Sequence, residues 1–511
     1  KARVSGDSRR VLPLAETPAT LTVVTETQLE DSGRTDFRAI LDAQPGITIG
    51  TGEGGNQFGD RYIIRGQEAR SDVFVDGLRD PGLQARESFA VEQIEITKGP
   101  SATFAGRGAS GGAVNAISKQ ASLEYDFHNL DLSVGTDEHL RTTIDSNVVL
   151  GDRFALRSNF LFTREDVPDR DPASRERRGF ALAGRFDATD RVSVLADYYH
   201  VSGRDRSDLG QAIAGLDSGG QPITDIPSYA QAEDFQNGDV DILTLRVAIR
   251  LNDAFTLENT ARRGQTEGGY LTTQATRSNR GINDPVAPGA IDYRISNTRT
   301  GWQDIDYVAD RLNLVGRFET GALEHSLVAG VEYTDYDVLG RHGSGTTGGY
   351  GFTATGAFNC INGTGTALNA WCVTDGAGNR LSNFDELVGR TGITRNPLAT
   401  STWAVQTRAA YLMDSIRLNE QWTVAGGVRV DTSPGRRAPT SMVANPMSGR
   451  TAATAACARS PIRPVATSFS KVTRSARATL SSARSGPCST TSCCSRRRSS
   501  RRPRAISSRA A

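Results

Sequence analysis

The sequence predicts a mainly β protein, in which a compact N-terminal α+β unit is followed by an antiparallel transmembrane β-barrel. Residues 61–119 contain short apolar runs separated by Gly, Pro and Asp-Gly, a pattern typical of short strands joined by tight turns. From Ala121 to Asp431, apolar residues alternate with polar ones, as expected for strands that face lipid on one side only. No apolar run is long enough for a helical membrane span, so that class of membrane protein is excluded.

The N-terminal unit is expected to span residues 15–120, after a flexible, polar lead of residues 1–14. Its helix should begin after Asp36, a residue that caps helices well, and should end before Pro45-Gly46. The elements expected in this unit before residue 61 are a strand, this helix, a second strand and a glycine-rich loop, at residues 20–24, 37–41, 47–49 and 51–59.

Eleven strands are expected in residues 121–431, each close to the roughly 9–11 residues that a tilted membrane strand requires. They lie at residues 130–134, 140–148, 154–162, 179–186, 191–201, 240–250, 254–263, 308–318, 325–335, 402–413 and 421–430. Short links between strands alternate with long ones at 164–178, 202–239, 264–307 and 336–401. Outer-membrane barrels alternate short turns with long outer loops in this way.

The formal net charge of +1 combines two chemically different segments. The chain has 59 Lys and Arg against 58 Asp and Glu, but residues 432–511 hold 16 of the basic residues and none of the acidic ones. The first 431 residues therefore carry a net charge of −15. We interpret the Ser-, Ala- and Arg-rich segment 432–511 as disordered. It is either a basic tail that binds polyanions or an out-of-frame translation product, and the abrupt change of composition favours the second origin.

Five glycine-containing motifs follow one another in the N-terminal unit. They are Ile64-Arg65-Gly66, Asp76-Gly77, Ile94 to Pro100, Gly106-Arg107-Gly108 and Gly111 to Asn115. In this order they resemble the plug domain of the TonB-dependent outer-membrane receptors, in the siderophore branch. The stretch from Leu78 to Phe89 resembles the catecholate members most closely. The resemblance implies a plug inside a barrel of about 22 strands, of which this chain supplies about half.

The resemblance further implies a receptor and transporter in the outer membrane of a Gram-negative type of cell. It would bind a ferric siderophore, of catecholate type, and import it in a step energised by TonB and its inner-membrane complex. No cofactor, resident metal or nucleic acid is implied, because iron enters only as part of the siderophore. Two alternatives are a non-functional, frameshifted remnant of such a receptor and a passive pore. The chain begins at Lys1 with no recognisable signal peptide or TonB box, as expected for a mature form or a fragment.

Candidate ligand-binding residues lie in plug loops that, by resemblance, face the outer vestibule. Planar guanidinium groups suit oxygen-rich anions such as a ferric catecholate complex. The candidates are Arg86, Arg79, Arg70, Gln67 and Phe58. The alternative is that these arginines pair with the nearby acids Glu68, Asp72, Asp80 and Glu87 as solvated loop charges, and both interpretations remain open.

Two other residue pairs have structural roles in this interpretation. The resemblance implies that Arg65 and Arg107 lock the plug onto acids of the barrel wall. Cys360 and Cys372 lie twelve positions apart in one long loop, a spacing that favours a local disulfide in an oxidising compartment. A zinc site is disfavoured, because neither cysteine has a His or second Cys at a suitable spacing.

A dinucleotide-binding enzyme is the main catalytic alternative. Gly106-x-Gly108-x-x-Gly111 matches that fingerprint, and Asp131 follows at about the right distance. The residues after Gly111 form a β-branched run and a turn, whereas the fingerprint requires a helix there. The five histidines show no paired spacing that would indicate a metal enzyme. We therefore expect no catalytic activity.

Overall fold

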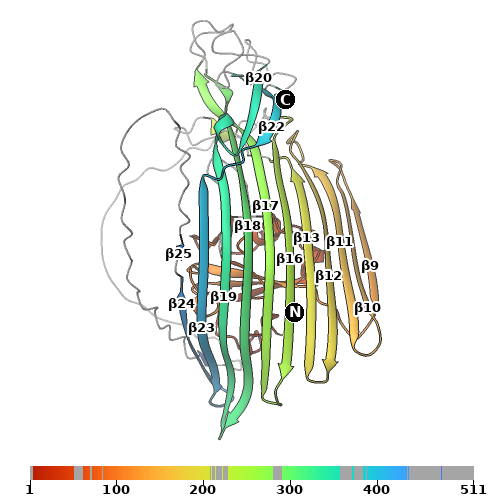
Figure 1. Ribbon diagram of the computed structural model, residues 1–511, viewed down its shortest axis with the longest axis vertical. Helices are drawn as coiled ribbons and strands as arrows, with labels where there is room; N and C mark the ends of the chain where they lie inside the picture. Colours follow the sequence, from red (N-terminus) through yellow and green to blue (C-terminus); the bar gives the residue numbers. More distant parts are fainter. Residues whose placement is uncertain are drawn as a thin grey trace, which may run out of the picture.

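The structure, a computed structural model, describes residues 4–50, 61–69, 72–82, 84–207, 228–279, 291–356 and 388–433. It also describes the short segments 209, 213–214, 221–222, 371–372, 384–386, 435–436 and 473–474. None of the described helices is both long and apolar enough to cross a membrane. The described residues form an N-terminal plug and a large antiparallel sheet, and Figure 1 shows the plug against one face of that sheet at mid-height.

The plug is built on a five-stranded sheet in the order β1-β7-β8-β5-β6. Its strands are β1 (Leu21–Thr25), β5 (Val73–Val75), β6 (Leu78–Arg79), β7 (Val91–Lys98) and β8 (Gly112–Ser118). A three-stranded sheet consists of β2 (Ile47–Ile49), β3 (Tyr62–Ile64) and β4 (Gln67–Glu68), and the helices are α1 (Glu26–Ser32), α2 (Phe37–Asp42) and α3 (Ala102–Ala105). Because Gly111 is followed by strand β8, the helix that a dinucleotide site needs is absent at this point.

The capped helix and both early strands of the plug lie where the sequence predicted them. The side chain of Asp36 accepts a hydrogen bond from the Ala39 N–H at 2.7 Å, which fixes the start of α2. Helix α1 was not expected, although its capping box of Thr25 and Gln28 was visible in the sequence. The predicted loop 51–59 lies outside the described residues. The buried core joins helix, strand and hairpin side chains, among them Phe37, Leu41, Tyr62, Ile64, Ile94, Ile96 and Val114.

Residues 4–14 differ from the flexible lead that their polar composition predicted. Asp7 and Arg9 are buried and paired at 2.7 Å, and Gly6 packs against Ile117 of β8. Asp7 and Arg9 neutralise each other inside the molecule, and Arg10 lies 4.0 Å from Glu95 of β7. The domain boundaries themselves, at residues 15, 121 and 432, stay predictions.

The large sheet contains, within the described residues, the eleven long strands that the sequence predicted. They are β9 (Phe127–Val134), β10 (Leu140–Val149), β11 (Phe154–Asp166), β12 (Ser174–Thr189), β13 (Val192–Asp205), β16 (Phe235–Arg250), β17 (Phe255–Asn279), β18 (Ile291–Thr320), β19 (Leu323–Ser344), β23 (Ser401–Arg417) and β24 (Trp422–Thr432). Each pairs antiparallel with its sequence neighbours in this series. The shorter elements are β14 (Ile213–Ala214), β15 (Gln221–Pro222), η3 (Gly345–Thr347), β20 (Tyr350–Gly356), β21 (Trp371–Cys372), η4 (Phe384–Glu386), β22 (Val388–Arg395), β25 (Gly435–Arg436) and β26 (Thr473–Arg474).

Several strands are much longer than predicted, because hydrogen bonding continues beyond the apolar alternation. β17 has 25 residues, β18 has 30 and β19 has 22, so they extend into the predicted links 264–307 and 336–401. The extensions are rich in Gly, Thr and charged residues, which carry no lipid-facing pattern. The short turns lie at the lower end in Figure 1, and β20 and β22 extend the upper end. The predicted tail 432–511 lies mostly outside the described residues.

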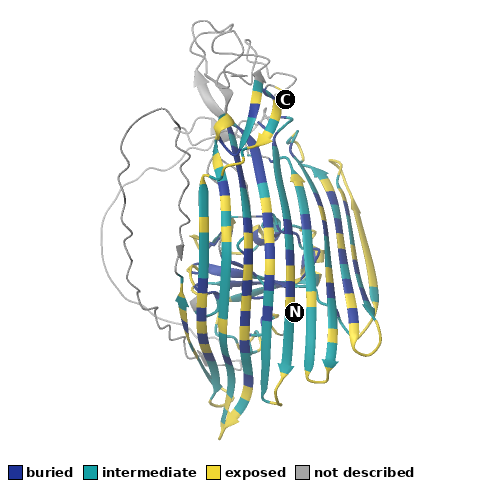
Figure 2. Ribbon diagram, in the orientation of Figure 1, coloured by how far each residue is buried: buried dark blue, intermediate teal, exposed yellow. Residues whose placement is uncertain are grey.

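The two faces of the large sheet differ in polarity. Figure 2 shows buried and exposed residues alternating along the strands. The face turned away from the plug exposes large apolar side chains, including Leu130, Leu132, Ile144, Phe160, Leu182, Leu243, Leu245, Val308, Leu312, Val331, Leu412, Val428 and Val430. This arrangement is that of a sheet in contact with lipid on its outer face.

Gly112 provides a test of the plug sheet. Its φ is +148°, and a Cβ atom there would lie 2.1 Å from the carbonyl oxygen of Thr97 on the neighbouring strand. We expect Gly112→Ala to lower the free energy of plug unfolding by at least about 1–3 kcal/mol, the cost of the backbone strain alone. Pulse proteolysis in urea measures it.

Gly426→Ala in β24 is the matched control, since nothing lies within 4 Å of a Cβ atom at that position. It should change the stability by less than about 1 kcal/mol. Equal effects of the two substitutions would contradict the close packing of β8 on β7.

Candidate functional site

The barrel wall presents a set of arginines to the plug. They lie at the polar positions of the alternating strand pattern and are buried or nearly buried. The set consists of Arg141, Arg157, Arg177, Arg246, Arg262, Arg311 and Arg429. A guanidinium keeps its charge when it is buried, so each of these side chains needs hydrogen-bond acceptors close by. The acceptors come partly from the wall and partly from the plug.

Asp76 of the plug is the centre of the first contact. It lies in the tight turn after β5, with φ of +50°, and is followed by Gly77 with φ of +75°. Its Oδ2 accepts hydrogen bonds from Arg246 Nη2 at 2.5 Å and from Arg262 Nη2 at 3.2 Å. Its carbonyl oxygen accepts a third, from Arg311 Nη2 at 3.1 Å. Three neighbouring barrel strands therefore hold one plug residue.

The environment of Asp76 keeps its carboxylate ionised. Burial by itself raises the pKa of this group, but the charges of Arg246 and Arg262 and the hydrogen bonds from Ser118 outweigh it, so the pKa of Asp76 lies below its usual value. The Ser118 backbone N–H and hydroxyl donate to the carboxylate at 2.9 and 2.8 Å, which fixes its orientation from the plug side.

Glu87 of the plug makes the second contact. Its carboxylate accepts hydrogen bonds from Arg141 Nη1 at 3.0 Å and from Arg177 Nη1 at 2.5 Å, and the residue is 3% exposed. Arg177 is held from the wall as well, because its Nη2 donates to Asp205 at 2.9 Å. In both contacts the plug supplies the acid and the wall the arginines.

The sequence analysis assigned the lock to plug arginines on wall acids, and the structure places those arginines as follows. Arg107 reaches the wall, where its Nη2 donates to the hydroxyl of Thr407 at 3.3 Å, so its partner there is not an acid. Arg65 is exposed, and its side chain lies beside Gly99 of the plug. The roles of both in locking the plug stay predictions.

Two of the three predicted ligand-binding arginines, Arg79 and Arg86, are paired with acids. The Arg86–Asp80 pair is buried, unlike the solvated loop charges of the alternative interpretation. Arg86 donates to Asp80 Oδ2 at 2.7 Å and is buried, and Arg79 donates to Asp72 at 3.0 Å. Arg79 also donates to the carbonyl oxygens of Ala105 and Arg107, which places it beside the Gly106-Arg107-Gly108 motif.

The other predicted site residues add little to the geometry. Gln67 is exposed in β4. Phe58, Arg70 and Cys360 lie outside the described residues, and only the backbone of Cys372 is described, in β21. Ligand contact and the disulfide therefore stay predictions.

A recess of about 130 Å³ opens where the plug meets the outer ends of β12 and β13. Arg38 of α2 and Arg86 line it from the plug, and Arg175, Arg177 and Arg206 line it from the wall. The two acids in its lining are Asp36 and Asp205. Five guanidinium groups and two carboxylates line the recess. Three further acids outside the lining, Asp80, Glu87 and Glu165, pair with Arg86, Arg177 and Arg175.

Among the described residues, two donor groups of residues that line the recess lack an acceptor. In the part of the chain that the structure describes, Nε of Arg177 and Nε of Arg206 are buried and have no hydrogen-bond partner. Arg177 is only 7% exposed, so water reaches it poorly. An anionic, oxygen-rich group would satisfy these donors.

The sequence analysis missed the wall arginines and the two plug acids as partners. Their positions in the polar phase of strands, such as Arg246 between Leu245 and Val247, were a visible signal that they face the lumen. Nothing in a single sequence says which of the plug's carboxylates each one meets.

Asp76→Asn tests the first contact. The substitution keeps the size of the side chain but leaves Arg246 and Arg262 without the plug's charge. We expect it to weaken plug seating by about 3–5 kcal/mol, as for the loss of one partner of a buried ion pair. Hydrogen exchange of β5 and β8 amides measures it. Asp239→Asn breaks the exposed pair with Arg204 and should cost about 0–1 kcal/mol.

The lowered pKa of Asp76 also predicts a pH dependence. A depressed carboxylate pKa contributes stability above the ordinary value, about 3.9, and that stability is lost as the pH falls through the lower, folded-state pKa. Plug seating should therefore be constant between pH 5 and 8 as far as this group is concerned, and weaken below about pH 4. The Asp76→Asn variant should lack this loss of plug seating at low pH. If the variant and the unmodified chain lose seating equally as the pH falls, the loss does not come from Asp76.

Comparison with known proteins agrees with this architecture. Residues 13–113 match the family described as TonB-dependent Receptor Plug Domain. The chain is 36% identical over 329 residues to the probable TonB-dependent receptor BfrD of Bordetella pertussis, a match that covers 63% of this chain and 43% of that protein. It is 30% identical over 445 residues to the probable TonB-dependent siderophore receptor PiuA of Acinetobacter baumannii, covering 84% of this chain and 56% of that one.

A solved structure is similar over almost the whole chain. The closed form of the ferric-catecholate import receptor Fiu from Escherichia coli K12 matches with a TM-score of 0.71 and 25% identity, covering 93% of this chain and 63% of that one. The chain thus spans about half the length of the curated relatives it matches. These relatives are named as receptors and not as enzymes. With a plug and a lipid-facing sheet of this type, the chain belongs to the family of TonB-dependent receptors.

Proposed function

We propose that this protein is an outer-membrane receptor that binds a ferric siderophore, of catecholate type, and imports it in a step energised by TonB. The observation that carries the proposal is the arginine-lined recess between plug and barrel. A ferric catecholate presents several oxygens with negative charge, and guanidinium groups bind such surfaces through charge-assisted hydrogen bonds.

The position of the recess supports a receptor that responds to its ligand. Arg177 lines the recess and also holds Glu87 of the plug, so an anion bound there competes with Glu87 for the same guanidinium. Binding would draw Arg177 toward the ligand and weaken one of the two contacts between plug and wall. Recognition and release of the plug then share a residue.

The names of the relatives support the ligand class. PiuA is named as a siderophore receptor, and Fiu as a ferric-catecholate import receptor. The partner TonB follows from the family name, and the outer membrane from the apolar outer face of the sheet. Iron belongs to the ligand in this proposal, which requires no resident metal.

The experiment is a titration of the full chain, refolded in detergent, with the ferric complex of 2,3-dihydroxybenzoate. Arg206→Gln removes one recess guanidinium that donates only to the Pro172 carbonyl in the described part of the chain. We expect the affinity of the Arg206→Gln variant for this ferric complex to fall about tenfold or more, as for the loss of one charge-assisted hydrogen bond.

Arg204→Gln is the matched control. Arg204 lies two residues before Arg206, near the end of β13, is half exposed and pairs with Asp239 outside the recess. The Arg204→Gln variant should bind the ferric catecholate with unchanged affinity. A neutral ferric hydroxamate should bind the unmodified chain more weakly than the catecholate does. Equal affinities of the unmodified chain and Arg206→Gln would overturn the recess as the binding site.

A further inference from the structure

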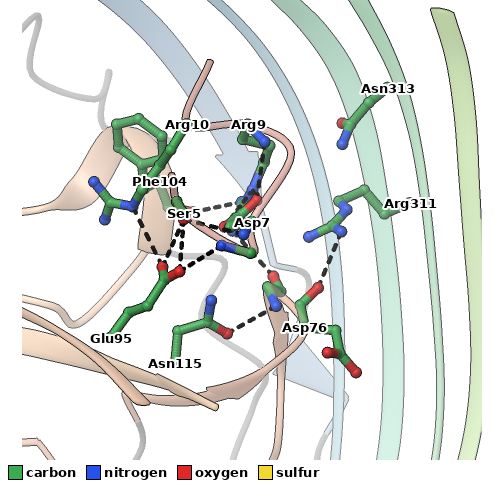
Figure 3. Close-up of polar contacts among 12 residues, drawn as sticks. Ser5, Asp7, Arg9, Arg10, Asp76, Glu95, Phe104, Asn115, Arg311 and Asn313 are labelled. Carbon is green, nitrogen blue, oxygen red and sulfur yellow. Dashed lines mark hydrogen bonds and ion pairs between the residues drawn. The ribbon is translucent and has the colours of Figure 1, made fainter. Parts of the chain in front are cut away.

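Residues 5–10, here called the strap, cross the plug on the side of barrel strand β18. Figure 3 shows them between Glu95 of β7 and Arg311 of β18. The strap has no regular secondary structure. Within the described residues its backbone makes no hydrogen bond to backbone groups outside the strap, so it is not a strand of either sheet. Side-chain contacts alone hold it in place.

Glu95 anchors the first half of the strap. Its carboxylate accepts hydrogen bonds from the Ser5 hydroxyl at 2.7 and 2.8 Å and from the Gly6 N–H at 2.6 Å. A further one comes from Gln93 on its own strand at 2.8 Å. Glu95 is 1% exposed and lies in the middle of β7. A buried carboxylate in the centre of a sheet needs such donors, and the strap supplies most of them.

The Asp7–Arg9 pair anchors the second half. The two side chains bind each other, and both residues are 4% exposed. Arg9 then donates to two plug carbonyl groups, Gly77 at 3.1 Å through Nη2 and Phe104 at 2.8 Å through Nη1. The pair is neutral as a unit. Arg10, the last residue of the strap, lies 4.0 Å from the Glu95 carboxylate and donates to the Thr97 hydroxyl at 2.8 Å, so it adds a charged contact to the first anchor.

The strap meets the first plug–wall contact at Gly77. A Cβ atom at Gly77 would lie 2.4 Å from Arg311 Nη1 and 3.0 Å from Arg9 Nη2, so strap and wall approach the same turn from two sides. Arg311 holds the carbonyl oxygen of Asp76, the residue before it. The side-chain Oδ1 of Asn115 accepts a hydrogen bond from the Gly77 N–H at 2.8 Å. A displacement of the strap therefore acts directly on the turn that seats the plug.

There is room for the strap to move. A cavity of about 360 Å³ adjoins its C-terminal end, between Arg9–Leu12, the plug and the short-turn ends of β19, β23 and β24. The wall there carries small side chains, including Ser326, Ser415, Ala425, Gly426 and Gly427.

We propose that residues 5–10 are a releasable strap, anchored on Glu95, which opens before the plug sheet does and whose departure loosens the Asp76–Gly77 turn from the wall. Along the chain, the Ser5 and Gly6 anchors on Glu95 precede the Arg9 contacts at Gly77, and Arg10 then pairs with Glu95 again at 4.0 Å. The device does not depend on the identity of the ligand.

Hydrogen exchange of the ligand-free full chain in detergent tests the strap. In the unmodified chain, a peptide covering residues 5–10 should exchange faster than peptides from β7 and β8. Glu95→Gln should raise the exchange rate of the strap peptide about tenfold or more, since it removes the charge that Ser5 and Gly6 bind. The β8 peptide around Val114 should keep its protection.

Glu92→Gln is the matched control, because Glu92 lies on the same strand with a half-exposed side chain and does not contact the strap. It should leave the strap peptide unchanged. Asp7→Asn, which disrupts the second anchor without altering β7, should speed exchange in the strap and in the Asp76–Gly77 turn that Arg9 contacts. The strap is refuted if its protection falls only together with that of β7 and β8, or if neither Glu95→Gln nor Asp7→Asn changes it.

Discussion

The seating of the plug depends on buried guanidinium groups of the wall that complete their hydrogen bonding with plug carboxylates. Each side depends on the other. Without Glu87, Arg141 loses the carboxylate it binds, and without Arg246 and Arg262 the Asp76 carboxylate keeps only the donors of Ser118. Wall acids orient some of the same arginines, as Asp197 does for Arg246. Such a joint differs from an apolar core, because its parts can exchange partners or admit water without exposing large apolar surfaces.

Two features of the molecule act on this joint from opposite ends. The recess shares Arg177 with Glu87 at the outer ends of the strands, and the strap reaches Gly77 from the side of β18. Both features contact residues of this joint directly. A change at either one can therefore reach the joint without passing through the apolar core. The plug core of Phe37, Ile94 and Val114 can stay folded while its attachments change.

The sequence was most informative where local chemistry decides the structure. Alternation located all eleven long strands, and the Asp36 cap located α2, because lipid contact and helix ends are set by residues close in the chain. It failed for strand length in β17 and β18, whose outer halves have no lipid to face. It also failed for residues 4–14, which are ordered by Glu95 and Gly77, some 70 to 90 positions away. Partners across the plug–wall boundary, such as Glu87 and Arg177, are unrelated in sequence and become neighbours only in the fold.

The wall arginines also determine the charge that the inner face of the sheet would present without the plug. Several of them keep an acid beside them on the wall, but among the described residues Arg141, Arg262 and Arg311 have carboxylate or carbonyl partners only on the plug. Moving the plug aside would leave these three fixed positive charges facing water. Fixed charges of one sign attract counter-ions and repel ions of their own sign. The seat of the plug would therefore attract anions once the plug has left it, through the same residues that hold the plug in place.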